Sequence, residues 1–149
     1  MSQAPEPVSS TRLYAFIARC FTSCGMPPKD AETAAELMTL ADLMGQDGHG
    51  VFRLPMYIRR IRAGGMNMTP KFTRLKDRPA TALIDGDNGL GHLVMHHATT
   101  LAMEKAEKTG IAWVGARHSN HAGPEYDRHL YRRGQCQPCA AMGGHGNAA

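Results

Sequence analysis

The first 65 residues repeat apolar side chains at helical spacing. Over residues 10–24 they recur every three or four positions, at Leu13, Phe16, Ile17, Cys20 and Phe21. Ser10 stands where a cap belongs, and Gly25 follows the last apolar turn. A second stretch runs from Pro28 to Gly45, and a third over residues 55–63 ends at a glycine pair. We therefore predict an all-helical unit over residues 10–65, preceded by a disordered leader over 1–9.

The pattern changes after residue 65. Residues 66–79 are polar and carry two prolines, which predicts a linker. ATALID (80–85) then indicates a strand, DGDNGLG (85–91) a turn, HLVMHHATTLAMEKAEKTG (92–110) a helix, and IAWVGA (111–116) a second buried strand. Strand, helix and strand of these lengths are typical of a βαβ unit with parallel strands, which we place over residues 80–124. The expected fold class is α/β, with the helical unit first.

The glycines of the predicted turn do not form a classical dinucleotide fingerprint. Gly86, Gly89 and Gly91 give G-x-x-G-x-G, whereas the fingerprint is G-x-G-x-x-G. We expect them instead to allow a tight turn and close packing of strand against helix.

Composition narrows the functional classes. The chain has 149 residues and a net charge of +4, but its two arginine groups, at 53–62 and 128–133, lack interleaved aromatic residues and any known docking motif. We therefore expect no nucleic-acid binding. No apolar run approaches the roughly 18 residues of a membrane span, and the start does not resemble a secretory signal. Two cysteine pairs do not indicate a disulfide framework, so we expect a cytoplasmic protein.

Two clusters carry candidate chemistry. His49, Arg53 and Tyr57 are spaced by four, so helical geometry would place them on one face. Arginine can hold a carboxylate with two hydrogen bonds, tyrosine can donate a hydroxyl, and histidine, with an ordinary pKa near 6.5, can move a proton. From spacing alone, a solvated loop with a half-buried tyrosine is the favoured interpretation of the same residues.

The second cluster is RHSNHAGP, directly after the second predicted strand. Open α/β sheets bind ligands beyond the carboxyl ends of their strands, where Asn120 can donate to a substrate oxygen and a histidine, His118 or His121, can act as general acid or base. A turn rich in turn-forming residues is the competing interpretation.

A metal site is the alternative use of the histidines. His92 and His96 lie at i, i+4, but no glutamate follows His92 to act as a base. Cys136, Cys139, His129 and His145 match no standard zinc spacing. We predict no metal, and keep as the alternative function a small basic metal- or partner-binding module that uses the Cys/His tail.

Two segments resemble one enzyme family. ADLMGQDGHGVFRLPMYIRRIRAGG and ALIDGDNGLGHLVMHHATTLAMEKAEKTGIAWVGARHSNHAGP are similar, in order and spacing, to blocks of the second, non-Rossmann type of malate/L-lactate dehydrogenase, over about residues 10–124. The resemblance rests on HG-x-x-R-x-x-x-Y and S-N-H-x-G. It implies a mixed α/β fold and a cytoplasmic homodimer that interconverts 2-hydroxy and 2-keto acids with NAD or NADP.

The resemblance also implies roles for individual residues. His49 and His121 match catalytic histidines, Arg53 and Tyr57 match substrate-contacting positions, and Asn120 would help to position the substrate. Gly48 stands where family members often have serine, which removes one substrate contact and leaves the exact substrate open. Cofactor-binding residues are not identified.

The resemblance stops after Pro124. Family members are longer than 149 residues, so the chain is expected to be a truncated fragment without most of the cofactor site, inactive alone. Residues 125–149 show no apolar periodicity. We hypothesise that the coding DNA is read out of frame from Asp127, because synonymous codons permit a family-like peptide in the next frame. Cys136 and Cys139 would then have no ligand role.

Overall fold

The computed structural model describes residues 6–123 and the backbone of 145–146. The chain begins with α1 (Ser10–Ser23), α2 (Pro28–Leu43), the two short 3-10 turns η1 (Asp47–His49) and η2 (Val51–Arg53), and α3 (Leu54–Arg62). The helix cap of α1 is Ser9 and not the expected Ser10: the Ser9 hydroxyl accepts a hydrogen bond from the backbone N–H of Arg12 at 3.4 Å. The predicted helices of this unit are otherwise confirmed.

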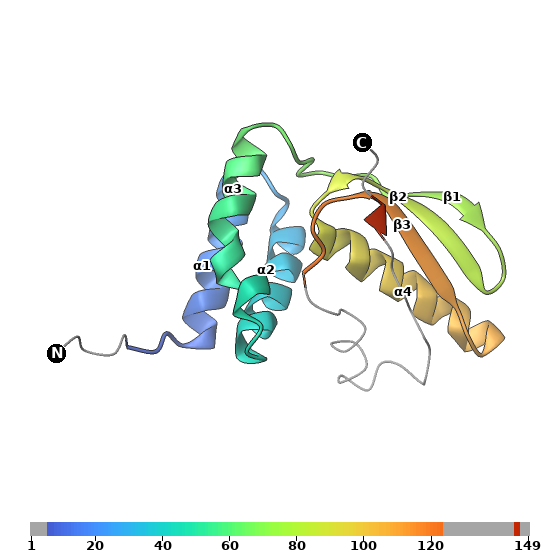
Figure 1. Ribbon diagram of the computed structural model, residues 1–149, viewed down its shortest axis with the longest axis horizontal. Helices are drawn as coiled ribbons and strands as arrows, with labels where there is room; N and C mark the ends of the chain where they lie inside the picture. The colour runs from blue at the N-terminus through green and yellow to red at the C-terminus, as the bar shows by residue number, and fades with distance from the viewer. Residues whose placement is uncertain (1–5, 124–144, 147–149) are drawn as a thin grey trace.

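The second part is a mixed sheet with one long helix across it (Figure 1). Its elements are β1 (Thr73–Asp77), β2 (Thr81–Gly89), α4 (Gly91–Thr109), β3 (Trp113–Ser119) and β4 (His145–Gly146), and the sheet order is β1-β2-β3-β4. β1 pairs with β2 antiparallel, whereas β2 with β3 and β3 with β4 are parallel. The parallel βαβ unit predicted from the sequence, and with it the α/β class, is confirmed.

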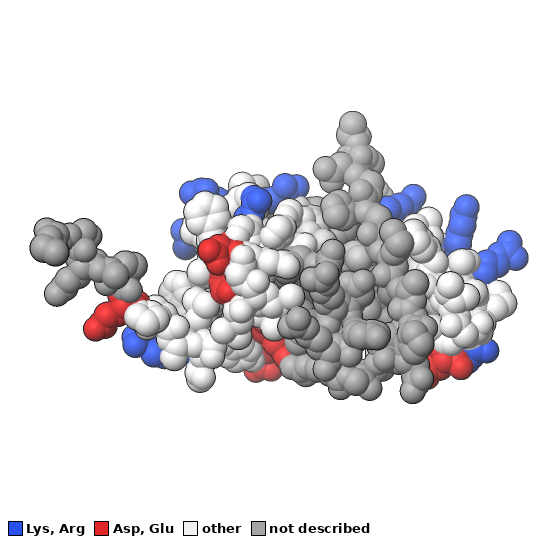
Figure 2. Space-filling model, turned by 60° about the horizontal axis from the view of Figure 1, so that its bottom comes forward, with Lys and Arg blue, Asp and Glu red and all other residues white. Residues whose placement is uncertain are grey.

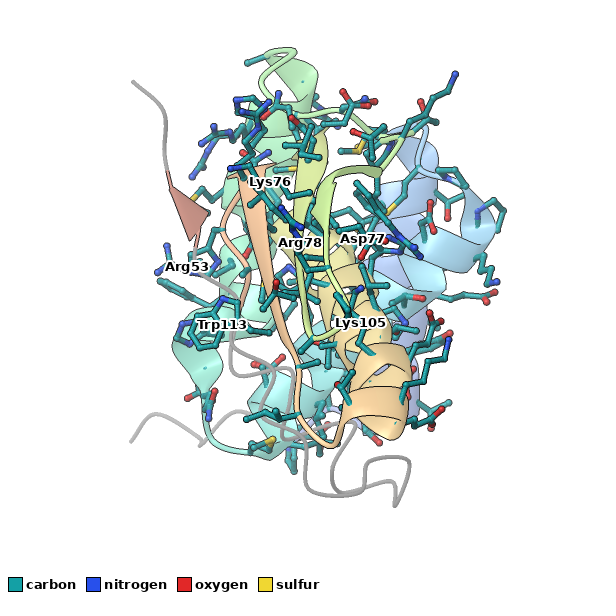
Figure 3. The ribbon with its side chains drawn as sticks, turned by 90° about the vertical axis from the view of Figure 1, so that its right-hand side faces the viewer. Arg53, Lys76, Asp77, Arg78, Lys105 and Trp113 are labelled. Carbon is teal, nitrogen blue, oxygen red and sulfur yellow. The ribbon has the colours of Figure 1, made fainter. Side chains whose placement is uncertain are left out.

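The expected linker over residues 66–79 contains strand β1. All five residues of β1 are exposed, so neither face of this edge strand shows the alternation that marks a half-buried strand. The Lys105 ammonium of α4 binds the Asp77 carboxylate and donates to the Arg78 carbonyl at 2.7 Å. These contacts, whose residues are labelled in Figure 3, tie the edge strand to the helix.

The predicted turn at 85–91 is largely strand. β2 continues to Gly89 through a register shift after Asp85, with left-handed backbone at Asp87 (φ 49°) and Asn88 (φ 54°). β3 likewise runs three residues beyond the predicted end at 116, to Ser119. Polar residues complete both strands, and the apolar pattern therefore underestimated their length.

One core joins the helical unit to the sheet. Leu90, just before α4, and Leu93 of α4 are buried together with Ile17 and Phe21 of α1. Ala122, just after β3, packs with Leu37 of α2. A separate core fills the space between α4 and the sheet. The loops after β2 and β3 are thereby pressed against the helical unit, and the candidate residues lie at this junction.

The surface carries its charge in separate groups. On the described part of the face in Figure 2, Lys and Arg side chains lie toward the ends, interrupted by acidic and uncharged residues. None of the helices in the described part of the chain combines the length and apolar character that crossing a bilayer requires.

Candidate functional site

The half-buried carboxylate of Asp42 fixes the loop that carries His49 and Arg53. Asp42 accepts a hydrogen bond from the Val51 N–H at 2.9 Å, and a Cβ on Gly50 would overlap the same carboxylate. Partial burial raises the pKa of Asp42, against the lowering effect of that hydrogen bond. Only glycine at position 50 lets the backbone pass this close to Asp42.

The segment that carries His121 approaches α4 just as closely. A Cβ on Gly91 would overlap the backbone carbonyls of Asn120 and His121, and a Cβ on Gly86 would lie 2.9 Å from Val94. The expectation that these glycines serve close packing is confirmed. Asn120 adds hydrogen bonds from its backbone N–H to the Gly89 carbonyl (3.2 Å) and from its side-chain amide to the same carbonyl (3.0 Å).

Together these contacts assemble a cluster from distant parts of the chain. The His49 and His121 rings stack, with centroids 5.4 Å apart and an interplanar angle of 19°. The Tyr57 hydroxyl lies 2.8 Å from His121 Nδ1. The His92 ring meets the Tyr57 ring edge-on at 5.6 Å. Two half-buried imidazoles thus lie over a fully buried layer of Tyr57 and His92.

Burial sets the protonation of the lower layer. Tyr57 is 1% exposed, and desolvation raises its pKa to about 12 in spite of the nearby Arg53 charge. His92 is 0% exposed, and burial, followed by the charges of His121 and His49, lowers its pKa to about 3. At neutral pH the Tyr57 hydroxyl and the His92 imidazole are therefore both uncharged.

The five predicted site residues do not all face the same way. His49, Tyr57 and His121 converge as expected, and Arg53 lies on the His49 loop, held by its Nε–H donating to the Gly48 carbonyl at 2.7 Å. The Asn120 amide instead points to the end of β2, where it also contacts the Asn88 carbonyl at 2.9 Å.

His92 was missed as a member of this cluster. In the sequence, His92 stands out only as a possible metal ligand paired with His96 at i, i+4. The available signal was its place in the first turn of α4, directly after Gly91, which brings the His121 segment close.

A second polar group lies beside the cluster. The Asp85 carboxylate contacts Arg117 Nε at 3.1 Å and His118 Nδ1 at 2.9 Å. The pKa of Asp85 is lowered most by the hydrogen bond that its carboxylate accepts from the Asp87 N–H, at 2.9 Å. Hydrogen bonds from Arg117 and His118 lower it further. His118 therefore pairs with a carboxylate in the strand ends.

Gly86 and Gly89 of β2 and Gly91 at the start of α4 offer no cradle for a dinucleotide phosphate. The space beside Gly86 is taken by Val94 and the His118 carbonyl, that beside Gly89 by Pro70, and that beside Gly91 by the His121 segment. A pyrophosphate needs such backbone surfaces open. These glycines therefore do not provide the phosphate site of an NAD or NADP cofactor.

Within the described residues, no three His, Cys, Asp or Glu side chains are placed to hold a metal ion. Cys136, Cys139 and the side chain of His145 fall outside the described residues.

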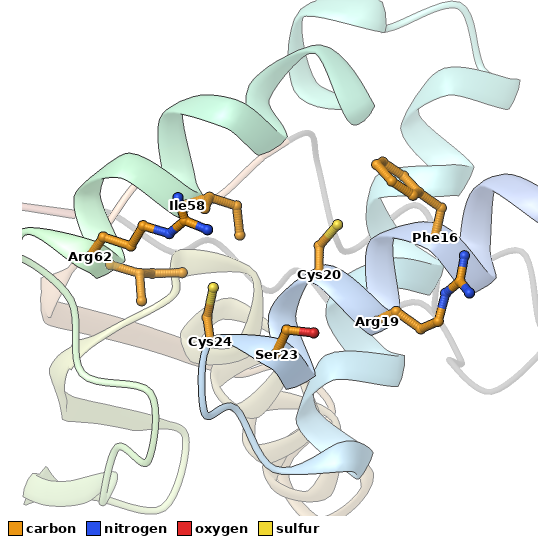
Figure 4. A pocket seen from close by; sticks show the side chains of 8 residues that line it. Phe16, Arg19, Cys20, Ser23, Cys24, Ile58 and Arg62 are labelled. Atoms are coloured by element: carbon orange, nitrogen blue, oxygen red, sulfur yellow. The ribbon is translucent and has the colours of Figure 1, made fainter.

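Cys20 and Cys24 are half-buried free thiols in a groove of about 620 Å³ between α1 and α3 (Figure 4). Burial and the neighbouring Cys24 raise the pKa of Cys20, against the weaker effect of Arg19. The groove shares no lining residue with the histidine cluster.

Comparison with known proteins identifies the relatives of this arrangement. The malate/L-lactate dehydrogenase family matches residues 8–127. A malate dehydrogenase of Pyrococcus horikoshii is 46% identical over 116 residues, which are 78% of this chain and 32% of that protein. An L-sulfolactate dehydrogenase of Methanocaldococcus jannaschii is 42% identical over 118 residues, 79% of this chain and 33% of its own.

Solved structures agree. The structure of the Pyrococcus horikoshii malate dehydrogenase superposes with a TM-score of 0.77 and 45% identity, covering 79% of this chain and 34% of that one. The chain thus spans about a third of the length of the relatives it matches. The family match ends at residue 127, three residues beyond Pro124. By the extent of this match and the shared fold, the chain belongs to the malate/L-lactate dehydrogenase family.

Proposed function

We propose that this chain forms the substrate-side part of an oxidoreductase that interconverts 2-hydroxy and 2-keto acids with NAD or NADP. The observation that carries the proposal is the stacked pair His49 and His121 with Arg53 on the same loop as His49. The relatives named above act, by their names, on malate and on sulfolactate, both of which are 2-hydroxy acids.

Arg53 is the group that would bind the substrate carboxylate. Its Nε donates to the Gly48 carbonyl, and its Nη1 contacts the sulfur of Met56 at 3.7 Å. Among the described residues no carboxylate forms a salt bridge with Arg53. A guanidinium held at its base in this way presents its outer N–H groups to a planar anion.

His49 or His121 would serve the oxygen at the second carbon. Reduction of a keto group requires a proton on that oxygen, and oxidation of the alcohol requires its removal. Both imidazoles are half-buried, while the layer beneath them stays uncharged. Because the chain's own atoms fill the space beside Gly86, Gly89 and Gly91, we place the cofactor phosphate contacts away from this segment. The homodimer, the cytoplasmic location and the inactivity of these 149 residues alone belong to the same proposal.

Ligand binding to the chain itself tests the substrate side. Malate should shift the ring resonances of His49 and His121 more than succinate, which offers Arg53 the same carboxylate but lacks the hydroxyl. Arg53→Lys should weaken malate binding about tenfold, since losing one charge-assisted hydrogen bond costs roughly 1.5 kcal/mol. Arg62→Lys, in the groove of α3, is the control and should bind malate normally.

A chimaera tests the reaction. Residues 8–127 would replace the matching segment of the Pyrococcus horikoshii malate dehydrogenase, and reduction of 2-keto acids by NADH and NADPH would be measured. We expect activity, lowered roughly 10²–10⁴-fold by His49→Ala, by His121→Ala or by both. A folded chimaera that is inactive, or that keeps full activity in each of these two variants, would refute the proposed role.

A further inference from the structure

We propose that Tyr57 is a positioning residue for His121, which it holds in the tautomer with the proton on Nε2, and not a substrate contact. The inference rests on the proposed function only where the Nε2–H of His121 is said to donate to a substrate oxygen. Its starting point is burial: Tyr57 is 1% exposed, so its hydroxyl faces the interior and meets His121 there.

The hydrogen bonds at His121 Nδ1 fix the tautomer. The backbone N–H of Gly123 lies 3.3 Å from Nδ1, and a backbone N–H can only donate. In the neutral ring Nδ1 must therefore carry the lone pair. The Tyr57 hydroxyl, which can donate or accept, then also donates to Nδ1, at the shorter distance of 2.8 Å. The proton of neutral His121 is left on Nε2.

The Tyr57 ring is held from two sides. The Phe21 ring of α1 lies 6.5 Å from it, and the His92 ring of α4 meets it edge-on at 5.6 Å. Both neighbours are fully buried, so the direction of the hydroxyl is set by the joint core of helical unit and sheet. The high pKa of Tyr57 keeps the hydroxyl protonated throughout the neutral range.

This arrangement presets what neutral His121 offers a ligand. An Nε2–H is a donor to the keto oxygen of a 2-keto acid, but it cannot accept the hydroxyl proton of a 2-hydroxy acid, so His49 would take that proton in the oxidation direction. When His121 binds a second proton, Nδ1 becomes a donor and the Tyr57 hydroxyl can turn to accept from it. Tyr57 therefore supports both protonation states, whereas the Gly123 N–H supports only the neutral one.

The tautomer can be observed in the 149-residue chain without any activity. Long-range ¹H–¹⁵N correlation of the imidazole nitrogens, recorded where His121 is neutral and assigned with His121→Gln, distinguishes Nε2–H from Nδ1–H. We expect a single Nε2–H form. Tyr57→Phe, which keeps the ring packing, should lower the tautomer ratio about tenfold, the change that corresponds to a hydrogen bond of roughly 1.4 kcal/mol. Tyr14→Phe, on the α1 side of the core, is the matched control and should change nothing.

Two results would overturn the proposal. One is an Nδ1–H form of His121 in the unaltered chain, which requires no variant to fold. The other is a tautomer ratio in Tyr57→Phe equal to that in Tyr14→Phe. If the Nε2–H form is found and malate nevertheless fails to shift the His49 and His121 signals, the proposed function fails while the positioning role of Tyr57 stands.

Discussion

Replacing Gly91 with alanine would put a methyl group where the structure has backbone. The new Cβ would overlap the carbonyl groups of Asn120 and His121, which cannot rotate out of the way as a side chain could. The φ of Gly91 lies outside the left-handed region, so alanine causes no backbone strain there. The effect of Gly91→Ala therefore measures how tightly the His121 segment is pressed against α4.

The expected loss of stability is about 1–2 kcal/mol. Forcing an extra methyl group into a packed interior costs about 1–3 kcal/mol. Alanine offsets part of this, by about 0.4–1 kcal/mol, because it restricts the unfolded chain more than glycine does. Relief of the overlap requires a shift of the 120–121 backbone, which would lengthen the 2.8 Å contact between Tyr57 and His121.

Urea unfolding followed by circular dichroism, with the His121 ring signals recorded in parallel, would test this. Gly115→Ala in β3 is the matched control, because its Cβ would meet only the Leu83 side chain, at an ordinary 3.5 Å. Gly115→Ala should leave stability within about 0.5 kcal/mol of the original. Equal midpoints for the two variants, with unchanged His121 signals, would refute the close approach at Gly91.

Two further substitutions probe the same site. Gly50→Ala would push against the Asp42 carboxylate and should displace the His49 ring signals. Gly48→Ala is the control, because its Cβ would meet nothing within 4 Å and should leave those signals in place. Matching spectra for the two variants would contradict the close packing of Gly50 on Asp42. His92 tests pH dependence: its folded pKa of about 3 lies below its ordinary 6.5, so the unfolded state binds the proton first and stability falls as the pH drops from 6.5 toward 3. His92→Gln should remove about 1.4 kcal/mol per pH unit of that loss, and parallel pH profiles in urea unfolding would exclude a buried neutral His92.

The predicted helices and the parallel strand pair followed from local periodicity. Phe21 and Ile17 of α1 are fully buried, as their spacing predicted, and so are the inward residues of β2 and β3. Strand β1 escaped prediction because an edge strand exposed on both faces has no alternating pattern. Its place is decided by pairing with β2 and by Lys105 on Asp77, contacts that no local window contains.

For the candidate site, the sequence predicted which residue types take part, but not which side chains contact one another. The two motifs singled out His49 and His121, but the contact between Tyr57 and His121 spans 64 positions of sequence. The Asn120 amide, expected to face a substrate, holds the end of β2.

By itself, then, the sequence determined the elements and the chemistry available to them, because helices and half-buried strands impose their period on neighbouring residues. Only the tertiary structure decided the direction of each polar group. That direction depends on which buried surfaces meet: Gly50 against Asp42, Gly91 against the His121 segment, and the rings around Tyr57. Close packing of these surfaces turns a tyrosine and a histidine from different parts of the chain into one hydrogen-bonded pair.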